Sequence, residues 1–421
     1  MEFTTLALLL AQVAIVILVS RGLGLVTRLL GQPMVIAEMV AGILLGPSLF
    51  GLVFPHAYDA LFPTSSLPVL KMLSQFGLVL FMFLVGIELD PALLRGRRRA
   101  SIAISHTSIA LPFVLGVGGA WWLYDTHAPK GVALLPFALF LGTAMSVTAF
   151  PVLARILTER GLTQSRVGAI AIACAAVDDV TAWCLLAVVV AIAQAHAFTD
   201  AFWTIGLAAL FSAFMLLVAR PALRHLGARV AKTGLGTTAL AFVLLLLMVS
   251  AGVAEVIGIH ALFGAFLFGA VLPRDDGLAK QLAEKLESVA VVLLMPLFFA
   301  FSGLRTRIGL VSGIEHWLIV AALIGLATLG KFGGSTVAAR LTGMCWREAS
   351  AVGVLMNTRG LMELIVLNVG MELGVITPTL FTMLVLMALV TTFATTPILR
   401  WVYPDRELLR ETEGAAALSR T

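Results

Sequence analysis

Charged residues are scarce in this chain, and their scarcity excludes an ordinary soluble protein. Only 12% of the 421 residues are Asp, Glu, Lys or Arg, whereas 60% are hydrophobic. Soluble domains carry about 25% charged residues. This composition is typical of a helical protein that crosses a membrane several times. The net charge of +5 does not indicate a nucleic-acid partner, because the basic residues lie in short loops between apolar runs.

Cysteine is also rare, which excludes a disulfide framework or a cysteine-based metal centre. Cys174, Cys184 and Cys345 show neither a disulfide pattern nor a metal spacing. Cys174 and Cys184 would lie roughly 15 Å apart on one helix, too far to bridge. A glycine-rich nucleotide fingerprint is missing as well. No convincing signal peptide is seen either, since Glu2 rather than a basic residue precedes the first apolar run.

Long apolar runs fill the rest of the chain, and each is typical of a membrane-spanning helix. Thirteen are predicted at 4–20, 34–53, 69–89, 102–124, 131–154, 167–195, 201–219, 235–256, 258–273, 285–303, 314–338, 348–371 and 378–402. Only Gly258-Ile259-His260 separates the eighth from the ninth. Twelve spans is therefore the alternative count.

Basic residues are distributed unevenly between the predicted loops. With the N-terminus outside, 22 of the 28 Lys and Arg fall in inside loops or the tail, and only Lys130, Arg305 and Arg307 fall outside. This positive-inside pattern predicts an outside N-terminus, an inside C-terminus and an odd number of spans. The cluster Arg95–Arg99 is sufficiently explained as a topology anchor, with lipid-specific binding as its alternative.

Two adjacent aspartates, Asp178 and Asp179, lie in the middle of the run 167–195. A carboxylate at that depth costs roughly 2.5–3.5 kcal/mol even on gentle insertion scales, so intramembrane acids mark ion or proton sites by default. Neighbouring helix residues point about 100° apart, so the pair is able to serve two partners. The alternative is a structural polar pair satisfied by other helices.

Thirteen spans divide into two blocks of six separated by one helix. The two blocks would have opposite orientations in the membrane, as in an inverted repeat. A helix-breaking polar patch falls at the matching place in each half. The fifth span carries Ser146, Thr148 and Pro151, and Pro151 removes a backbone donor and clashes with the preceding turn. Paired broken helices are the best sequence indication of a transporter binding site, although a repaired proline kink is the alternative here.

The twelfth span carries the second patch, from Asn357 to Glu363. Arg359 and Glu363 are four residues apart and are expected to pair along one helix face, either at a functional site or as a structural salt bridge. In the eleventh span, Lys331 lies well inside the apolar run. We expect it to partner one aspartate; snorkelling to the inner surface is the alternative.

Several motifs, in chain order from residue 32 to 363, resemble the monovalent cation:proton antiporter-2 family, and most of all its cation/proton exchanger branch. They are Gln32-Pro33 through Ile36-Ala37-Glu38, Gly42-Ile43-Leu44-Leu45-Gly46-Pro47-Ser48, Phe83-Leu84-Val85-Gly86-Ile87-Glu88-Leu89-Asp90, Thr148-Ala149-Phe150-Pro151-Val152-Leu153-Ala154-Arg155, Asp178-Asp179-Val180-Thr181-Ala182-Trp183, Gly258-Ile259-His260-Ala261-Leu262-Phe263-Gly264-Ala265-Phe266, and Asn357 through Glu363.

The resemblance implies an all-α membrane protein with the sodium/proton antiporter fold, in which two inverted six-helix repeats contain crossed discontinuous helices. It implies a homodimer. The domains it implies are a dimerisation domain at 1–101 and 235–303, a core transport domain at 102–195 and 304–402, a linker helix at 196–234 and a short cytoplasmic tail at 403–421. Many relatives carry a large nucleotide-binding domain after the last span; none is expected here.

The resemblance also implies residue roles. Asp179 matches the carboxylate that alternately holds a proton and a cation, and Asp178 the carboxylate that pairs with the lysine, here Lys331. Thr148, with nearby Ser146, matches the extended stretch beside this site. Asn357, Arg359 and Glu363 match supporting polar residues of the second broken helix. The cation itself, at Asp178 and Asp179, would be the only metal, and no resident cofactor is expected.

The predicted function is therefore secondary active antiport rather than enzyme catalysis. A monovalent cation, Na⁺ or K⁺, would exchange for protons across a bacterial inner membrane, with lipid as the surrounding partner. Both ions stay open, because selectivity depends on cavity size and coordinating oxygens. The alternative is a cation channel or uniporter without proton coupling. An intramembrane aspartyl protease needs two aspartates facing each other, whereas these two are neighbours on one helix.

Overall fold

The computed structural model describes residues 5–88, 98–163, 165–195, 198–273 and 277–404, and every regular element among them is helical. Residues Arg95 and Arg97 of the basic cluster and the tail beyond residue 404 lie outside this part. The elements are α1 (Thr5–Leu29), α2 (Met34–Leu45), α3 (Phe50–Val53), α4 (Pro55–Leu61), α5 (Leu67–Glu88), α6 (Arg98–His127), α7 (Leu134–Ser146), α8 (Phe150–Glu159), α9 (Arg166–Gln194), α10 (Phe198–Phe214), η2 (Met215–Ala219), α11 (Arg220–Thr233), α12 (Thr237–Ile257), α13 (Ala261–Val271), α14 (Leu278–Val289), η3 (Ala290–Leu294), α15 (Met295–Arg305), η4 (Ile308–Leu310), α16 (Gly313–Thr328), η5 (Leu329–Gly333), α17 (Gly334–Leu341), α18 (Trp346–Met356), α19 (Leu361–Glu372) and α20 (Pro378–Val402).

Twelve helices among the described residues are long and apolar enough to cross a membrane. The thirteenth predicted span, at 258–273, is the shorter helix α13 of 11 residues, which at 1.5 Å per residue covers only about half of a ~30 Å bilayer core. It begins after a sharp turn, where Gly258 is left-handed and His260 has φ 74°. The side chain of Glu255 accepts a hydrogen bond from the Ala261 amide at 2.7 Å. The predicted punctuation between the eighth and ninth segments is confirmed.

The chain forms two compact units. One comprises residues 1–22, 40–90 and 187–305; the other comprises residues 23–39, 91–186 and 306–421. The dividing points fall inside α1, α2 and α9. The labels dimerisation domain and transport domain that the resemblance attaches to parts of the chain stay predictions.

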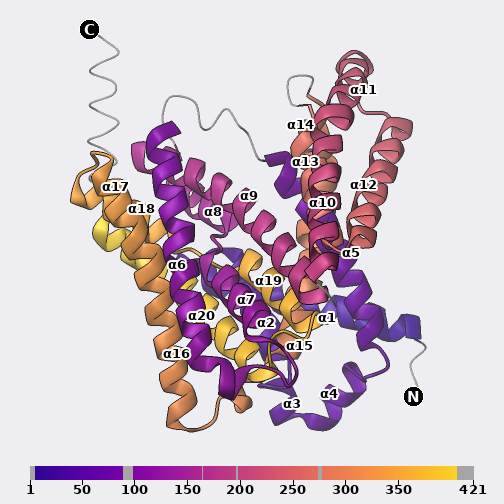
Figure 1. Ribbon diagram of the computed structural model, residues 1–421. Helices are drawn as coiled ribbons and strands as arrows, with labels where there is room; N and C mark the ends of the chain where they lie inside the picture. The colour runs from indigo at the N-terminus through magenta and orange to yellow at the C-terminus, as the bar shows by residue number, and fades with distance from the viewer. Residues whose placement is uncertain (1–4, 89–97, 164, 196–197, 274–276, 405–421) are drawn as a thin grey trace. The chain divides into compact units, whose positions relative to one another are not determined.

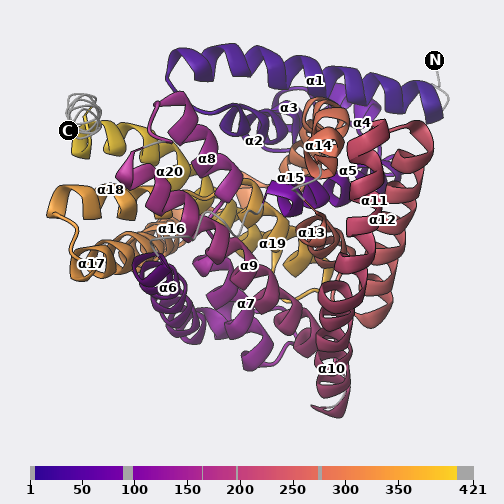
Figure 2. The ribbon, with the colours of Figure 1, turned by 90° about the horizontal axis from the view of Figure 1, so that it is seen from above.

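The first unit is held together by close helix contacts at small residues. Helix α13 packs against α5 and α12, and α10 lies beside α12 (Figures 1 and 2). A Cβ atom at Gly269 would overlap the carbonyl oxygen of Phe83, and one at Gly86 would overlap that of Phe266. Small residues at helix interfaces let the backbones approach in this way, as in other membrane proteins.

The second unit contains both predicted helix breaks. Helix α6 packs along α7 and α17, and α20 contacts α16, α18 and α19 (Figure 1). The fifth span divides into α7 and α8, because Pro151 begins a new helix while Val147 and Ala149 are extended. The twelfth divides into α18 and α19 at Gly360, whose φ of +126° is readily adopted only by glycine. Both predicted breaks are confirmed.

Candidate functional site

The two breaks meet in the middle of the second unit. The backbone amide of Ala149 donates to the carbonyl oxygen of Thr358 at 3.0 Å. The hydroxyl of Thr148 lies 3.2 Å from the carbonyl oxygen of Met356, the last residue of α18. Non-helical backbone at membrane depth is tolerated only where it is buried in protein or lines a cavity. Here each extended segment supplies hydrogen-bond partners for the other.

Arg359 is fully buried and joins the second break to the end of α7. Its guanidinium group donates to the carbonyl oxygens of Ala144 at 3.0 Å and Met145 at 2.6 Å. It also pairs with Glu363 at 2.6 Å, the predicted i,i+4 pair, and Glu363 is buried as well. The last carbonyl groups of a helix lack intrahelical partners and carry partial negative charge. Arg359 therefore satisfies the C-terminal end of α7 while Glu363 balances its charge.

Asp178 lies at the centre of the site, with no exposed surface. Its Oδ1 accepts a hydrogen bond from Ser105 at 2.6 Å. Its Oδ2 lies 2.9 Å from the Ser108 hydroxyl, 2.8 Å from the Thr148 hydroxyl and 3.0 Å from Lys331 Nζ. A buried carboxylate is tolerated when it is both paired and hydrogen-bonded. These four groups keep the Asp178 carboxylate both paired with a cation and hydrogen-bonded.

Lys331 reaches Asp178 from the π-helical turn η5, and its side chain is also fully buried. Its ammonium group donates to Ser108 Oγ at 3.0 Å and contacts Thr148 Oγ1. Single π-helical turns inside α-helices occur frequently at functional sites. Glycine at position 330 lets η5 pack closely against α6, since a Cβ atom there would lie only 2.7 Å from Pro112 Cα. This close packing brings Lys331 within reach of Asp178. The predicted Lys331–Asp178 pairing is confirmed in geometry.

Asp179 follows directly on α9 and is also fully buried. All four contacts described above are made by Asp178, and Asp179 points about 100° away around the helix. The buried cluster contains three acids, Asp178, Asp179 and Glu363, and two cations, Lys331 and Arg359. If all five are ionised, the cluster carries one excess negative charge. One monovalent cation or one proton would neutralise it.

The other predicted site residues lie at the two breaks without contacting Asp178. Ser146 is buried at the end of α7, where its hydroxyl donates to the Thr143 carbonyl at 2.8 Å. Asn357 caps the C-terminus of α18, and its buried Oδ1 has no hydrogen-bond partner among the residues that the structure describes. It lines a cavity of about 170 Å³ whose other lining residues include Thr328, Thr391 and Thr395. The ion-binding role of Ser146 and the supporting role of Asn357 stay predictions.

Two serines that the sequence analysis did not single out complete the site. Ser105 and Ser108 are three residues apart on α6, and Ser101 lies one turn earlier, where its carbonyl oxygen is 3.5 Å from Cys174 Sγ. All three serines are buried. Their i, i+4 and i+7 spacing on an apolar helix is the signal that could have found them, since it places their hydroxyl groups on one face.

A resident metal centre has no ligand set in the described part of the chain. No group of three or more His, Cys, Asp or Glu there could hold a metal ion. A transiently bound monovalent cation would be a different case, because hydroxyl and carbonyl oxygens also coordinate such ions.

Comparison with known proteins identifies the class. Residues 13–402 match the family described as sodium/hydrogen exchanger, transmembrane, and the chain belongs to this family of ion transporters. It is therefore a multi-pass integral membrane protein. The resemblance found in the sequence is confirmed.

Individual relatives are similar over nearly the whole chain. The Na⁺/H⁺ antiporter NhaS4 of Synechocystis sp. is 43% identical, covering 96% of this chain and 99% of that protein. Cation/H⁺ antiporter 17 of Arabidopsis thaliana is 40% identical and K⁺/H⁺ antiporter 1 of Saccharomyces cerevisiae is 36% identical. This chain spans only 50% and 47% of their respective lengths.

A solved structure shares the fold. The sodium proton antiporter MjNhaP1 from Methanocaldococcus jannaschii aligns with a TM-score of 0.69 at 13% identity, covering 94% of this chain and 97% of that one. The predicted all-helical antiporter fold is confirmed, with twelve long helices and one short helix in place of thirteen full spans.

Proposed function

We propose that this protein exchanges a monovalent cation, Na⁺ or K⁺, for protons across the membrane. The observation that carries the proposal is the fully buried Asp178–Asp179 pair, packed with Lys331 beside the contact between two broken helices. The family supports it, since relatives are named as Na⁺/H⁺, K⁺/H⁺ and cation/H⁺ antiporters.

Asp178 and Asp179 have different roles in this proposal. Asp178, which Lys331 and three hydroxyl groups surround, acts as the fixed charge that orients the site. Asp179 is the exchangeable carboxylate. Burial favours the protonated form of a carboxyl group in general, whereas a nearby cation favours the ionised form. Proton and metal cation therefore compete for one position, and this competition couples their fluxes.

Alternating access completes the cycle. The core unit moves so that the site opens first to one side of the membrane and then to the other, driven by the ion or proton gradient. A homodimer supplies the static part against which the core moves. The proposed setting is a bacterial inner membrane, with the N-terminus outside and the C-terminus inside, as the distribution of basic residues indicates.

Proteoliposomes test the proposal directly. Wild-type protein is reconstituted with a trapped pH dye, and Na⁺, K⁺ or Li⁺ is added in separate runs. We expect a cation-dependent pH change inside the vesicles for wild type and none for Asp179→Asn, because an amide does not exchange a proton at neutral pH. The cation that gives the response identifies the substrate.

Two results would contradict the proposal. One is proton-coupled cation flux that persists in Asp179→Asn. The other is a passive cation leak in wild type that leaves the internal pH unchanged, which would favour the channel. Asp200→Asn, on α10 and outside the cluster, is the matched control and should transport like wild type.

A further inference from the structure

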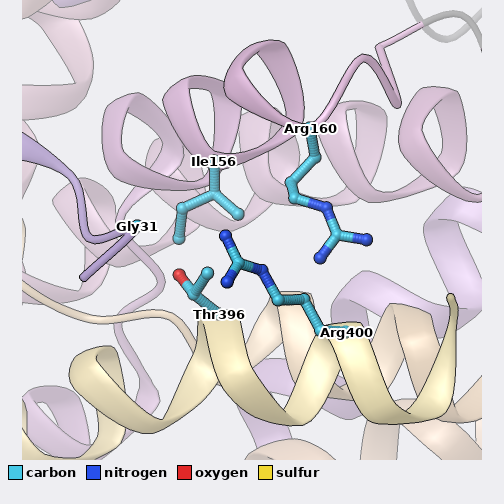
Figure 3. A pocket seen from close by; sticks show the side chains of 5 residues that line it. All are labelled: Gly31, Ile156, Arg160, Thr396 and Arg400. Atoms are coloured by element: carbon cyan, nitrogen blue, oxygen red, sulfur yellow. The ribbon is translucent and has the colours of Figure 1, made fainter. Parts of the chain in front are cut away.

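A second polar pocket lies in the same unit, away from the aspartate pair. It has a volume of about 130 Å³ and is lined by Gly31, Ile156, Arg160, Thr396 and Arg400. We call it the arginine pocket. Figure 3 shows the guanidinium group of Arg400 between Thr396 and Arg160, with both guanidinium groups turned toward the space between α8 and α20.

Helical spacing brings the lining side chains together. Thr396 and Arg400 are four residues apart on α20, and Ile156 lies four residues before Arg160 at the end of α8. Residues at i and i+4 share one helix face. Each helix therefore presents one arginine to the pocket, and two positive charges line a single cavity.

Gly31 shapes the third wall. It has φ +65°, and a Cβ atom there would lie 2.5 Å from a guanidinium nitrogen of Arg400. Any larger residue would therefore meet the Arg400 side chain as well as backbone strain. Glycine at position 31 therefore leaves room for the guanidinium group of Arg400 at the wall of the pocket.

Thr396 is the observation that indicates a ligand. It is 3% exposed, and its hydroxyl group has no hydrogen-bond partner among the described residues. The neighbouring threonines 391, 392 and 395 each donate to a carbonyl group one turn earlier. Burying a hydroxyl group without a hydrogen-bond partner is unfavourable, so the Thr396 hydroxyl indicates an acceptor or donor from outside the chain.

Arginines near helix C-termini are often explained by the helix dipole alone. That explanation accounts for Arg400 at the end of α20 and Arg160 at the end of α8. It does not account for the buried Thr396 hydroxyl or for the cavity between them. Arginine binds phosphate oxygens in a bidentate manner, and a hydroxyl group adds one further donor.

We propose that the arginine pocket binds a phosphate group, carried either by an anionic phospholipid or by a soluble phosphate. Surrounding residues favour the lipid source. Trp401, next to Arg400, is 83% exposed, and Leu29, two residues before Gly31, is 89% exposed. An exposed tryptophan beside basic residues is typical of the membrane interface, and basic pockets between helices bind lipid headgroups there.

The experiment measures binding rather than transport. Full-length protein is purified in mild detergent and titrated with phosphatidylglycerol or with phosphatidylcholine, and bound lipid is counted by native mass spectrometry. We expect one phosphatidylglycerol retained in preference to phosphatidylcholine. Arg160→Gln/Arg400→Gln should weaken that binding at least tenfold. Thr396→Val, which keeps the charge and shape, should weaken it about threefold or more.

Matched controls distinguish binding at a specific site from a general effect of positive charge. Arg220→Gln/Arg224→Gln removes two arginines from α11, outside the arginine pocket, and Thr395→Val removes a threonine hydroxyl that is already bonded. Both should retain the lipid. Equal loss in the control pair, or full retention in both pocket variants, would overturn the proposal. Thermal melting confirms that each variant is folded.

A second arm distinguishes the source of the phosphate. Inorganic phosphate is titrated against wild type and Thr396→Val in lipid-depleted detergent, with melting temperature as the readout. Stabilisation of wild type alone, without selective lipid retention, supports a soluble phosphate as the occupant. Selective lipid retention without a phosphate effect supports the phospholipid. Binding in neither arm would overturn the proposal.

Discussion

At the scale of single residues, the site is a set of charges whose neighbours determine their roles. Asp178 and Asp179 are adjacent in the sequence and equally buried, yet Asp178 is surrounded by Ser105, Ser108, Thr148 and Lys331. The predicted pairing of Lys331 with Asp178 depended on a family resemblance. Composition alone could identify the buried charges but not which of them would meet, because helices distant in sequence supply the partners.

Lys331 should affect the energetics of the exchange cycle. Lys331→Gln removes one of the two positive charges in the cluster and leaves Asp178 without its ammonium partner. We expect a shifted pH profile or less charge moved per cycle, measured as vesicle flux over pH and at imposed membrane potentials. Lys130→Gln, an exposed loop lysine, should match wild type. Unchanged profile and stoichiometry in Lys331→Gln would remove this residue from the mechanism.

Ser105 should contribute to stability through its hydrogen bond to Asp178. A hydrogen bond to a charged group is worth about 1.5–3 kcal/mol, so Ser105→Ala should lower the free energy of unfolding by about that amount in mixed-micelle denaturation. Ser212→Ala removes a hydroxyl bonded only to its own helix on α10 and should change it by less than about 0.5 kcal/mol. Equal effects of the two variants would contradict a specific role for Ser105.

At the scale of elements, the two broken helices form one structural unit. The sequence predicted both breaks from Pro151 and from the polar patch around Arg359, because proline and charge interrupt an apolar helix in recognisable ways. It did not predict that Arg359 would satisfy the carbonyl groups at the end of α7. That contact joins residues more than 200 positions apart, and no local pattern encodes it.

The π-helical turn η5 should depend on the close approach of α6. Gly330→Ala places a methyl group 2.7 Å from Pro112 Cα, which pushes η5 away and lengthens the contacts of Lys331. Overpacking of this kind costs about 1–3 kcal/mol. We expect reduced transport together with a lower melting temperature.

Gly325→Ala is the matched control for this variant. A Cβ atom at Gly325, on α16, meets nothing within 4 Å, and alanine is the better helix former. Its stability should be equal to or above that of wild type. A Gly330→Ala variant with wild-type transport and stability would show that η5 tolerates displacement from α6.

At the scale of the whole molecule, apolar runs predicted the helices well because membrane helices satisfy their own backbone groups and need little tertiary information. The ninth segment was the exception: hydropathy continues through 258–273, but the left-handed turn and its caps shorten the helix to α13. The arginine pocket could not be predicted from the sequence, because its walls come from segments that are distant along the chain, near residues 31, 156 and 400.

The predicted orientation is testable with a native cysteine. Cys345 is exposed and precedes α18 in a predicted inside loop, whereas Cys174 is buried. In a Cys174→Ala/Cys184→Ala background, a membrane-impermeant maleimide should label Cys345 in inverted vesicles and not in intact cells. Adding Lys130→Cys with Cys345→Ala should give the opposite pattern. Labelling of Cys345 from outside would reverse the assigned topology.

In the proposed exchange cycle, the single excess negative charge that the cluster carries when all five groups are ionised has a consequence for leakage. A carrier that returned empty would uncouple the two gradients. An unbalanced buried charge costs about 3–5 kcal/mol, which slows the empty return by roughly a hundredfold to a few thousandfold. With all five groups ionised, the imbalance of three acids against two cations would both attract a substrate cation and suppress slippage in the proposed cycle, so tight coupling would need no separate gate.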